Sequence, residues 1–191
     1  KVSCSSSASG LAVYNGRYLM TTMRRVPSGF VNSLRVQRVE TPERVDEILT
    51  ILLSEGAQVE RMVPKARLDG AFFDCRVLVV AGEPVFFIAR QSRHPITNLH
   101  LGGWRGDMDS LRRQVPAESW AAAMESCRKV WACHDCHHVG VDLMFEPGFE
   151  HHRIIEANAF GDLLPRLQRD GLDVYGWQIA HRPRARPGAA G

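Results

Sequence analysis

The chain has 191 residues, of which 45% are hydrophobic and 24% are charged, and its formal net charge is +3. These values are ordinary for a soluble globular protein with a sizeable core. The basic residues are too scattered to predict a nucleic-acid surface. No apolar run approaches the roughly 18 to 20 residues that span a bilayer, so we expect no membrane partner. Five irregularly spaced cysteines argue against a disulfide framework and for a reducing compartment, so we expect a cytoplasmic location.

The first third of the chain predicts antiparallel strands followed by one helix. Two β-rich runs, at residues 17–26 and 33–39, follow a loop of small residues. Thr41 and Pro42 mark a helix start, as its cap and first-turn residue, and Gly56 marks its end. Residues 58–64 are expected to form a short strand that runs into a linker.

The rest of the chain mixes strands and helices without a regular alternation. The predicted elements, in chain order, are strands at 75–81 and 85–90, a helix at 118–132, strands at 139–145 and 153–158, and a helix at 163–170. A turn at Gly82 joins the first two strands, and residues 92–107 form a loop long enough to suspect a function. Because no regular βαβ order is visible, the sequence predicts an α+β fold.

The most informative segment is the hairpin VGVDLMFEPGFEHHRIIEAN, residues 139–158. If its strands pair about the turn, Asp142 lies opposite Glu156, and Asn158 projects to the same face. The other face would carry apolar side chains: Val141, Leu143, Ile155 and Ala157. A divalent cation would remove the repulsion between the two acids, and oxygen-only ligands favour Mg²⁺. The alternative is a solvated hairpin whose acids face water.

This hairpin resembles the metal-binding signature of the ATP-grasp family, in which Gly-[Val/Ile]-Asp-hydrophobic precedes Glu-x-Asn by about a dozen residues. Gly140, Asp142, Glu156 and Asn158 match that signature. The segment is similar to the branch that includes the ribosomal-protein glutamate ligase RimK, and to uncharacterised bacterial ATP-grasp proteins that end the motif in NAFGDLLP. The resemblance implies two Mg²⁺ ions, with Mn²⁺ as a possible substitute. Asp142 would hold one ion, Glu156 would bridge both, and Asn158 would bind the second.

Two further segments resemble the family's ATP-binding elements in the expected order. Lys1 and the loop 5–10, with Ser7 and Gly10, resemble the lysine and the glycine-rich flap that cover the ATP phosphates. Serines stand here where glycines are common, and a frayed N-terminus is the alternative. Glu60 and Arg61 lie in a segment that resembles the hinge strand at the adenine edge, although a lone strand glutamate is usually a surface residue.

A third segment resembles the family's D-x-R and N-L-H-x-G-G motifs, at Asp74-x-Arg76 and at residues 98–103. Asp74 would meet a ribose hydroxyl, and Asn98 would orient phosphate oxygens. Arg76 and Arg90 would supply fixed positive charge to the transferred phosphoryl group. A surface ion pair is the alternative for Asp74 with Arg76. The related ligases carry an arginine two residues before the asparagine, where this chain has Ile96, so its substrate is expected to differ.

The segment Cys133-His-Asp-Cys136-His137-His138 matches the c-type haem pattern and half of a zinc site. It directly follows the predicted helix 118–132, and no second Cys/His pair completes a zinc ligand set. We therefore expect a helix end here, with metal or haem binding as the less favoured alternatives.

The resemblance implies the ATP-grasp domain of an ATP-dependent ligase that forms C–N bonds from a carboxylate and an amine, through an acyl phosphate. We expect a small lobe at 1–59, a large lobe at 60–180 with ATP between them, and a disordered basic tail at 181–191. The N-terminal domain that relatives carry is missing from the sequence and would be a partner, while the two substrates stay unidentified. The alternatives are a pseudoenzyme that binds Mg·ATP without turnover and a Cys/His metal-binding module.

Overall fold

The computed structural model describes residues 9–159 and 164–182, which fold as a mixture of helices and antiparallel sheets, as the α+β prediction requires. The chain divides into two compact units. Unit 1 comprises residues 1–64 and 91–104, and unit 2 comprises residues 65–90 and 105–191. The first segment of unit 1 ends at Pro64, whereas the predicted small lobe ends at Val59. Unit 1 also includes the segment 91–104, which was predicted to lie in the large lobe. Most of the predicted basic tail, residues 183–191, lies outside the described residues.

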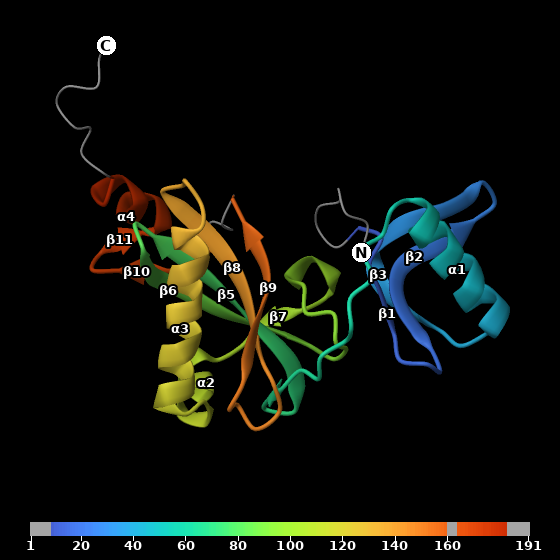
Figure 1. Cartoon of the computed structure of the whole chain (residues 1–191), viewed down its shortest axis with the longest axis horizontal. Coiled ribbons are helices and arrows are strands. Elements are labelled where there is room, and N and C mark those ends of the chain that lie inside the picture. Colours follow the sequence, from blue (N-terminus) through green and yellow to red (C-terminus); the bar gives the residue numbers. More distant parts are fainter. Residues whose placement is uncertain (1–8, 160–163, 183–191) are drawn as a thin grey trace, which may run out of the picture. The chain divides into compact units, whose positions relative to one another are not determined.

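Unit 1 is a three-stranded antiparallel sheet with one helix packed on it (Figure 1). Its elements are β1 (Ala12–Tyr14), β2 (Leu19–Val26), β3 (Gly29–Val39) and α1 (Pro42–Ser54). Helix α1 begins after Thr41 with Pro42 in its first turn, as predicted. Its apolar side chains recur at helical spacing and are buried against Leu19 of the sheet: Val45, Ile48 and Leu52.

The other face of this small sheet is covered by the segment 91–104. Ile96 and Leu101 are buried there, in contact with side chains from β1 to β3 and the residue before β1: Leu11, Val13, Met20 and Val36. The segment contains one short 3-10 helix, η1 (Leu99–Leu101). Ile96 therefore anchors the segment to the unit 1 sheet by apolar packing.

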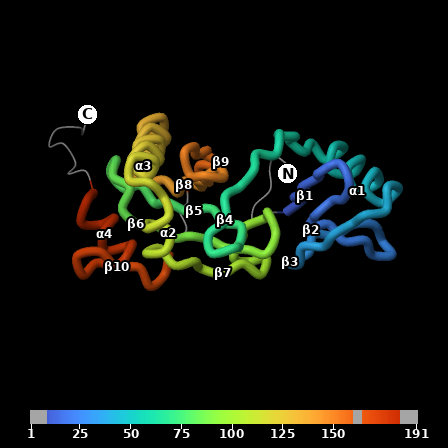
Figure 2. Tube along the Cα trace, turned by 90° about the horizontal axis from the view of Figure 1, so that it is seen from below, coloured from blue at the N-terminus to red at the C-terminus, as the bar shows by residue number. Residues whose placement is uncertain are grey.

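Unit 2 is built on a second, larger antiparallel sheet in the order β7-β6-β5-β8-β9, with β4 paired to β5. The strands are β4 (Arg67–Leu68), β5 (Ala71–Val80), β6 (Glu83–Ser92), β7 (Trp104–Arg105), β8 (His138–Phe145) and β9 (His152–Asn158). The remaining elements are α2 (Met108–Gln114), α3 (Ala117–Ala132), β10 (Gln168–Arg169), β11 (Leu172–Asp173) and α4 (Val174–Ala180). Figure 2 shows α3 lying along one face of this sheet.

The core of unit 2 lies between α3 and the central strands β5 and β8. Alternate residues of β5 and β8 are buried in one cluster with Ala123, Met124 and Cys127 of α3: Cys75, Val77, Val79, Val139, Val141, Leu143 and Phe145. Trp120 also belongs to this core. Since successive strand side chains point to opposite faces, the intervening residues of β5 and β8 lie on the face away from α3.

Residues 58–64 do not form the predicted strand and have no secondary structure. Val59 is 78% exposed and Met62 is 46% exposed, so neither side chain is buried against a neighbour. A β-rich composition is stable as a strand only where a partner strand takes up the backbone hydrogen bonds. Here no partner strand lies beside the segment in the described residues.

The helix predicted over 163–170 is also wrong, over its described part 164–170. Leu164 and Arg166 have positive φ values of 37° and 72°, and Pro165 between them has no backbone N–H. These features stop a helix, and the chain instead forms the β10–β11 hairpin followed by α4. Helices α2 and α4, of seven residues each, were not predicted because they are too short to show a clear period. Within the described residues, no helix is long and apolar enough to cross a membrane.

Candidate functional site

The predicted pairing of the acidic hairpin is confirmed by its register. Asp142 of β8 lies opposite Glu156 of β9, and Gly140 lies opposite Asn158. On the other side of β8, Asp142 lies opposite Arg76 of β5. Three neighbouring strands thus carry the row Arg76–Asp142–Glu156, and cross-strand pairs of this kind share one face of a sheet. This is the face away from α3.

The apolar face of the hairpin differs from the prediction in its β9 half. Between Asp142 and Leu143 the register shifts, so that Leu143 lies opposite Ile154 and Ile155 is the extra residue of a bulge. Ile154 packs against the unit 2 core, whereas Ile155 is 45% exposed and Ala157 is exposed. Val141 and Leu143 are fully buried, as expected. A bulge in an edge strand has no signal in the alternation of residue types, so the sequence could not place it.

Ion pairs in unit 2 join five side chains that are only 5–13% exposed, among the residues that the structure describes. The carboxylate of Asp142 accepts from Arg76 Nε, from Arg76 Nη2 at 3.3 Å and from Arg90 Nη2 at 3.1 Å. Arg90 Nε donates to Asp74 Oδ1 at 2.7 Å, and Lys65 Nζ lies 3.5 Å from Asp74 Oδ2. We call these five residues the buried ion-pair network. Asp74 and Arg76 are therefore part of a mostly buried network, not a surface ion pair.

The network holds three cations and two carboxylates. Burial alone would lower the pKa of Arg90, but Asp74 and Asp142 outweigh burial, so the pKa of Arg90 is raised above its ordinary value. Burial lowers the pKa of the Lys65 ammonium, and Asp74 opposes that effect. The three cationic side chains are only 9–13% exposed, so little water reaches their charges.

No role was assigned to Lys65 from the sequence. The residue follows Pro64 in an irregular stretch, where no periodicity distinguishes a buried lysine from an exposed one. Its burial depends on the packing of β5, because Asp74 on that strand provides its counter-charge.

The residues of the acidic hairpin fit a magnesium ion by two criteria. The first is chemical, since two carboxylates and one carboxamide are hard oxygen donors. The second is the Asn158 side chain, whose buried Nδ2 has no hydrogen-bond partner in the described parts of the chain. Rotating the amide about its last bond exchanges Nδ2 with Oδ1, so this unused position can present an oxygen to a cation. Asp142, Glu156 and Asn158 are therefore the residues that would hold the ion.

Across the described residues, no three His, Cys, Asp or Glu side chains gather closely enough to hold a metal ion by themselves. Mg²⁺ usually keeps several waters and is held by one or two carboxylates together with substrate phosphates.

Unit 1 carries the residues that were predicted to contact the ATP phosphates and adenine. Lys1 and Ser7 lie outside the described residues. Gly10 has a φ of 59°, and its N–H donates to Asn32 Oδ1 of β3 at 3.2 Å. Glu60 and Arg61 are exposed in the irregular segment that follows α1. Their predicted roles at the phosphates and the adenine stay predictions.

The motif at residues 98–103 has clear local roles in unit 1. The Asn98 side chain caps η1 by accepting from His100 N at 2.8 Å. Gly102 ends η1 in the left-handed region, with a φ of 84°. A Cβ on Gly103 would lie 2.7 Å from the carbonyl oxygen of Asn98 and 2.9 Å from that of Gln91, so only glycine fits there. These contacts explain the residue types of the motif without a ligand, and the predicted phosphate role of Asn98 stays untested.

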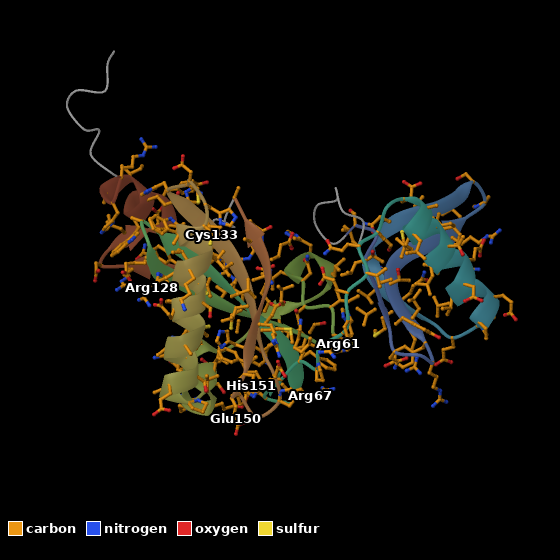
Figure 3. All side chains as sticks on the ribbon, in the orientation of Figure 1. Arg61, Arg67, Arg128, Cys133, Glu150 and His151 are labelled. Atoms are coloured by element: carbon orange, nitrogen blue, oxygen red, sulfur yellow. The ribbon has the colours of Figure 1, made fainter. Side chains whose placement is uncertain are left out.

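The Cys/His segment forms the predicted helix end. Helix α3 ends at Ala132, and the Cys133 N–H bonds to carbonyls of the last turn. His137 Nε2 donates to the Gln178 carbonyl of α4 at 2.9 Å, which connects the segment to that helix. In Figure 3, Cys133 lies at one end of unit 2, whereas Glu150 and His151 mark the β8–β9 turn at the other.

Comparison with known proteins identifies no family and no curated relative. A scan against models of protein families finds no match, and no curated protein matches the sequence. A functional proposal therefore rests on the residues of the site and on the resemblance of the motifs.

Proposed function

We propose that this chain is the Mg·ATP-binding, ATP-grasp domain of a ligase that joins a carboxylate to an amine through an acyl phosphate. The observation that carries the proposal is the row Arg76–Asp142–Glu156, with Arg90 and Asn158 beside it. It combines guanidinium groups, which bind phosphate in a bidentate manner, with the oxygen donors that Mg²⁺ takes.

The charge of the buried ion-pair network supports an anionic ligand. Lys65, Arg76 and Arg90 place three cations close together among mostly buried side chains, where water screens their charge poorly. A phosphate chain would bring negative charge next to Lys65 and both arginines.

The proposed reaction needs positioning and charge stabilisation more than a protein nucleophile. The substrate carboxylate attacks the γ-phosphorus of ATP and releases ADP, and the amine then displaces phosphate from the acyl phosphate. Bound Mg²⁺ would neutralise phosphate charge during the transfer. Arg76 and Arg90 would hold the transferred group in line, because a guanidinium group can donate two parallel hydrogen bonds to phosphate oxygens.

The decisive experiment is calorimetric titration of the chain with a non-hydrolysable ATP analogue in the presence of Mg²⁺. We expect saturable binding that weakens at least tenfold, about 1.4 kcal/mol, in the Glu156→Ala variant. Glu146→Ala is the matched control, because Glu146 directly follows β8 and pairs with the exposed Arg153. Unchanged binding in Glu156→Ala, or no binding by the unmodified chain at millimolar analogue, would contradict the proposal.

Turnover needs a second measurement. Phosphate release is followed with ATP and panels of carboxylic acids and amines. Release that depends on one acid and one amine would support a ligase. Nucleotide binding without release for any pair would favour the pseudoenzyme.

A further inference from the structure

The carboxylate of Asp142 is already engaged by both arginines of the site. Arg76 donates to both of its oxygens, and Arg90 donates to Oδ2. The three side chains are 9–13% exposed, so water screens these contacts poorly. Asp142 is thus a predicted metal ligand whose carboxylate already contacts two guanidinium groups.

We propose that Arg76 and Arg90 prevent a free divalent cation from binding to Asp142. A polyphosphate would make Asp142 available to the cation by drawing the two guanidinium groups to its own oxygens. Metal and nucleotide would then bind as a coupled pair, each strengthening the other. This inference rests on the proposed function, since it concerns how the same site takes its ligands.

The charges of the site indicate that a cation can reach Asp142 only together with an anion. A cation that reaches Asp142 without an anion meets two fixed guanidinium groups, and like charges this close repel strongly where water is excluded. A phosphate oxygen is an equivalent acceptor for a guanidinium fork, so the arginines can change partner without losing their hydrogen bonds. Asp142 then regains lone pairs for the metal.

The two arginines differ in their carboxylate partners. Arg90 Nε donates to Asp74, which also lies 3.5 Å from Lys65 Nζ, so Arg90 keeps one carboxylate partner when its Nη2 leaves Asp142. Arg76 has no second carboxylate among its ion pairs in the described residues. Arg76 is therefore the residue whose removal should free Asp142 most completely.

The test is a titration with Mn²⁺, followed by electron paramagnetic resonance, with and without a non-hydrolysable ATP analogue. We expect the analogue to raise the Mn²⁺ affinity of the unmodified chain at least tenfold. By thermodynamic reciprocity, Mn²⁺ should raise the affinity for the analogue by the same factor. Arg76→Gln should bind Mn²⁺ without the analogue at least tenfold more tightly than the unmodified chain does.

Arg153→Gln is the matched control, because Arg153 pairs with Glu146 near the β8–β9 turn and its side chain is 58% exposed. It should leave the affinity for Mn²⁺ unchanged. Arg90→Gln is a second variant, expected to change Mn²⁺ binding in the same direction as Arg76→Gln but less. Circular dichroism and the urea midpoint establish that each variant is folded before it is titrated.

The inference is overturned if the unmodified chain binds Mn²⁺ equally well with and without bound analogue, or if Arg76→Gln gains no Mn²⁺ affinity in a folded protein. Failure of the proposed function looks different. In that case the analogue does not bind at all, yet tighter Mn²⁺ binding by Arg76→Gln would still support the closure of Asp142 by the arginines.

Discussion

Replacing Asp142 by alanine should destabilise unit 2 strongly, because it leaves two guanidinium groups mostly buried with too few acceptors. Asp142 accepts from Arg76 and Arg90, and after its removal the network holds three cations and one carboxylate. Breaking a buried ion pair by removing one partner costs about 3–5 kcal/mol. For a chain of this size that loss lowers the melting temperature by about 6–20 °C.

The assay is urea unfolding followed by tryptophan fluorescence, since three of the four tryptophans lie in unit 2: Trp120, Trp131 and Trp177. Glu146→Ala is the control, because it removes the partner of the exposed Arg153 and should cost about 0–1 kcal/mol. If Asp142→Ala costs no more than this control, the carboxylate is not held by buried arginines and the reasoning fails.

Three further predictions concern the framework of the site. Phe145→Ala should cost about 3–5 kcal/mol in the same urea assay, because Phe145 is fully buried in the unit 2 core; a loss below 1 kcal/mol would contradict that packing. Gly103→Ala should destabilise unit 1, because the added Cβ would lie 2.7 Å from the Asn98 carbonyl oxygen. Hydrogen exchange should then show lower protection of unit 1 amides, and unchanged protection would refute this prediction. Burial, and then Arg153 and His151, lower the pKa of His152, so the neutral ring is favoured in the folded state and stability is lost as pH falls below about 6.5. His152→Gln should reduce the loss of urea stability between pH 7.5 and 5, and equal losses in both proteins would exclude this role.

The sequence by itself determined the local elements and the pairing of the acidic hairpin. Thr41 and Pro42 start α1, and the alternation along β8 places Val141 in the core and Asp142 on the other face. The turn between β8 and β9 then brings Glu156 opposite Asp142. These features depend on neighbours within about 20 residues, where backbone geometry fixes which side chains meet.

Tertiary structure alone decided which charges are buried together. Lys65, Asp74, Arg90 and Asp142 come from four separate stretches of the chain, and they meet only because β5 pairs with β8 and β6 lies on the far side of β5. The bulge that exposes Ile155 could not be predicted from the sequence either. The physical reason is that pairing between distant strands depends on the packing of the whole sheet, whereas turns and strand alternation depend on adjacent residues.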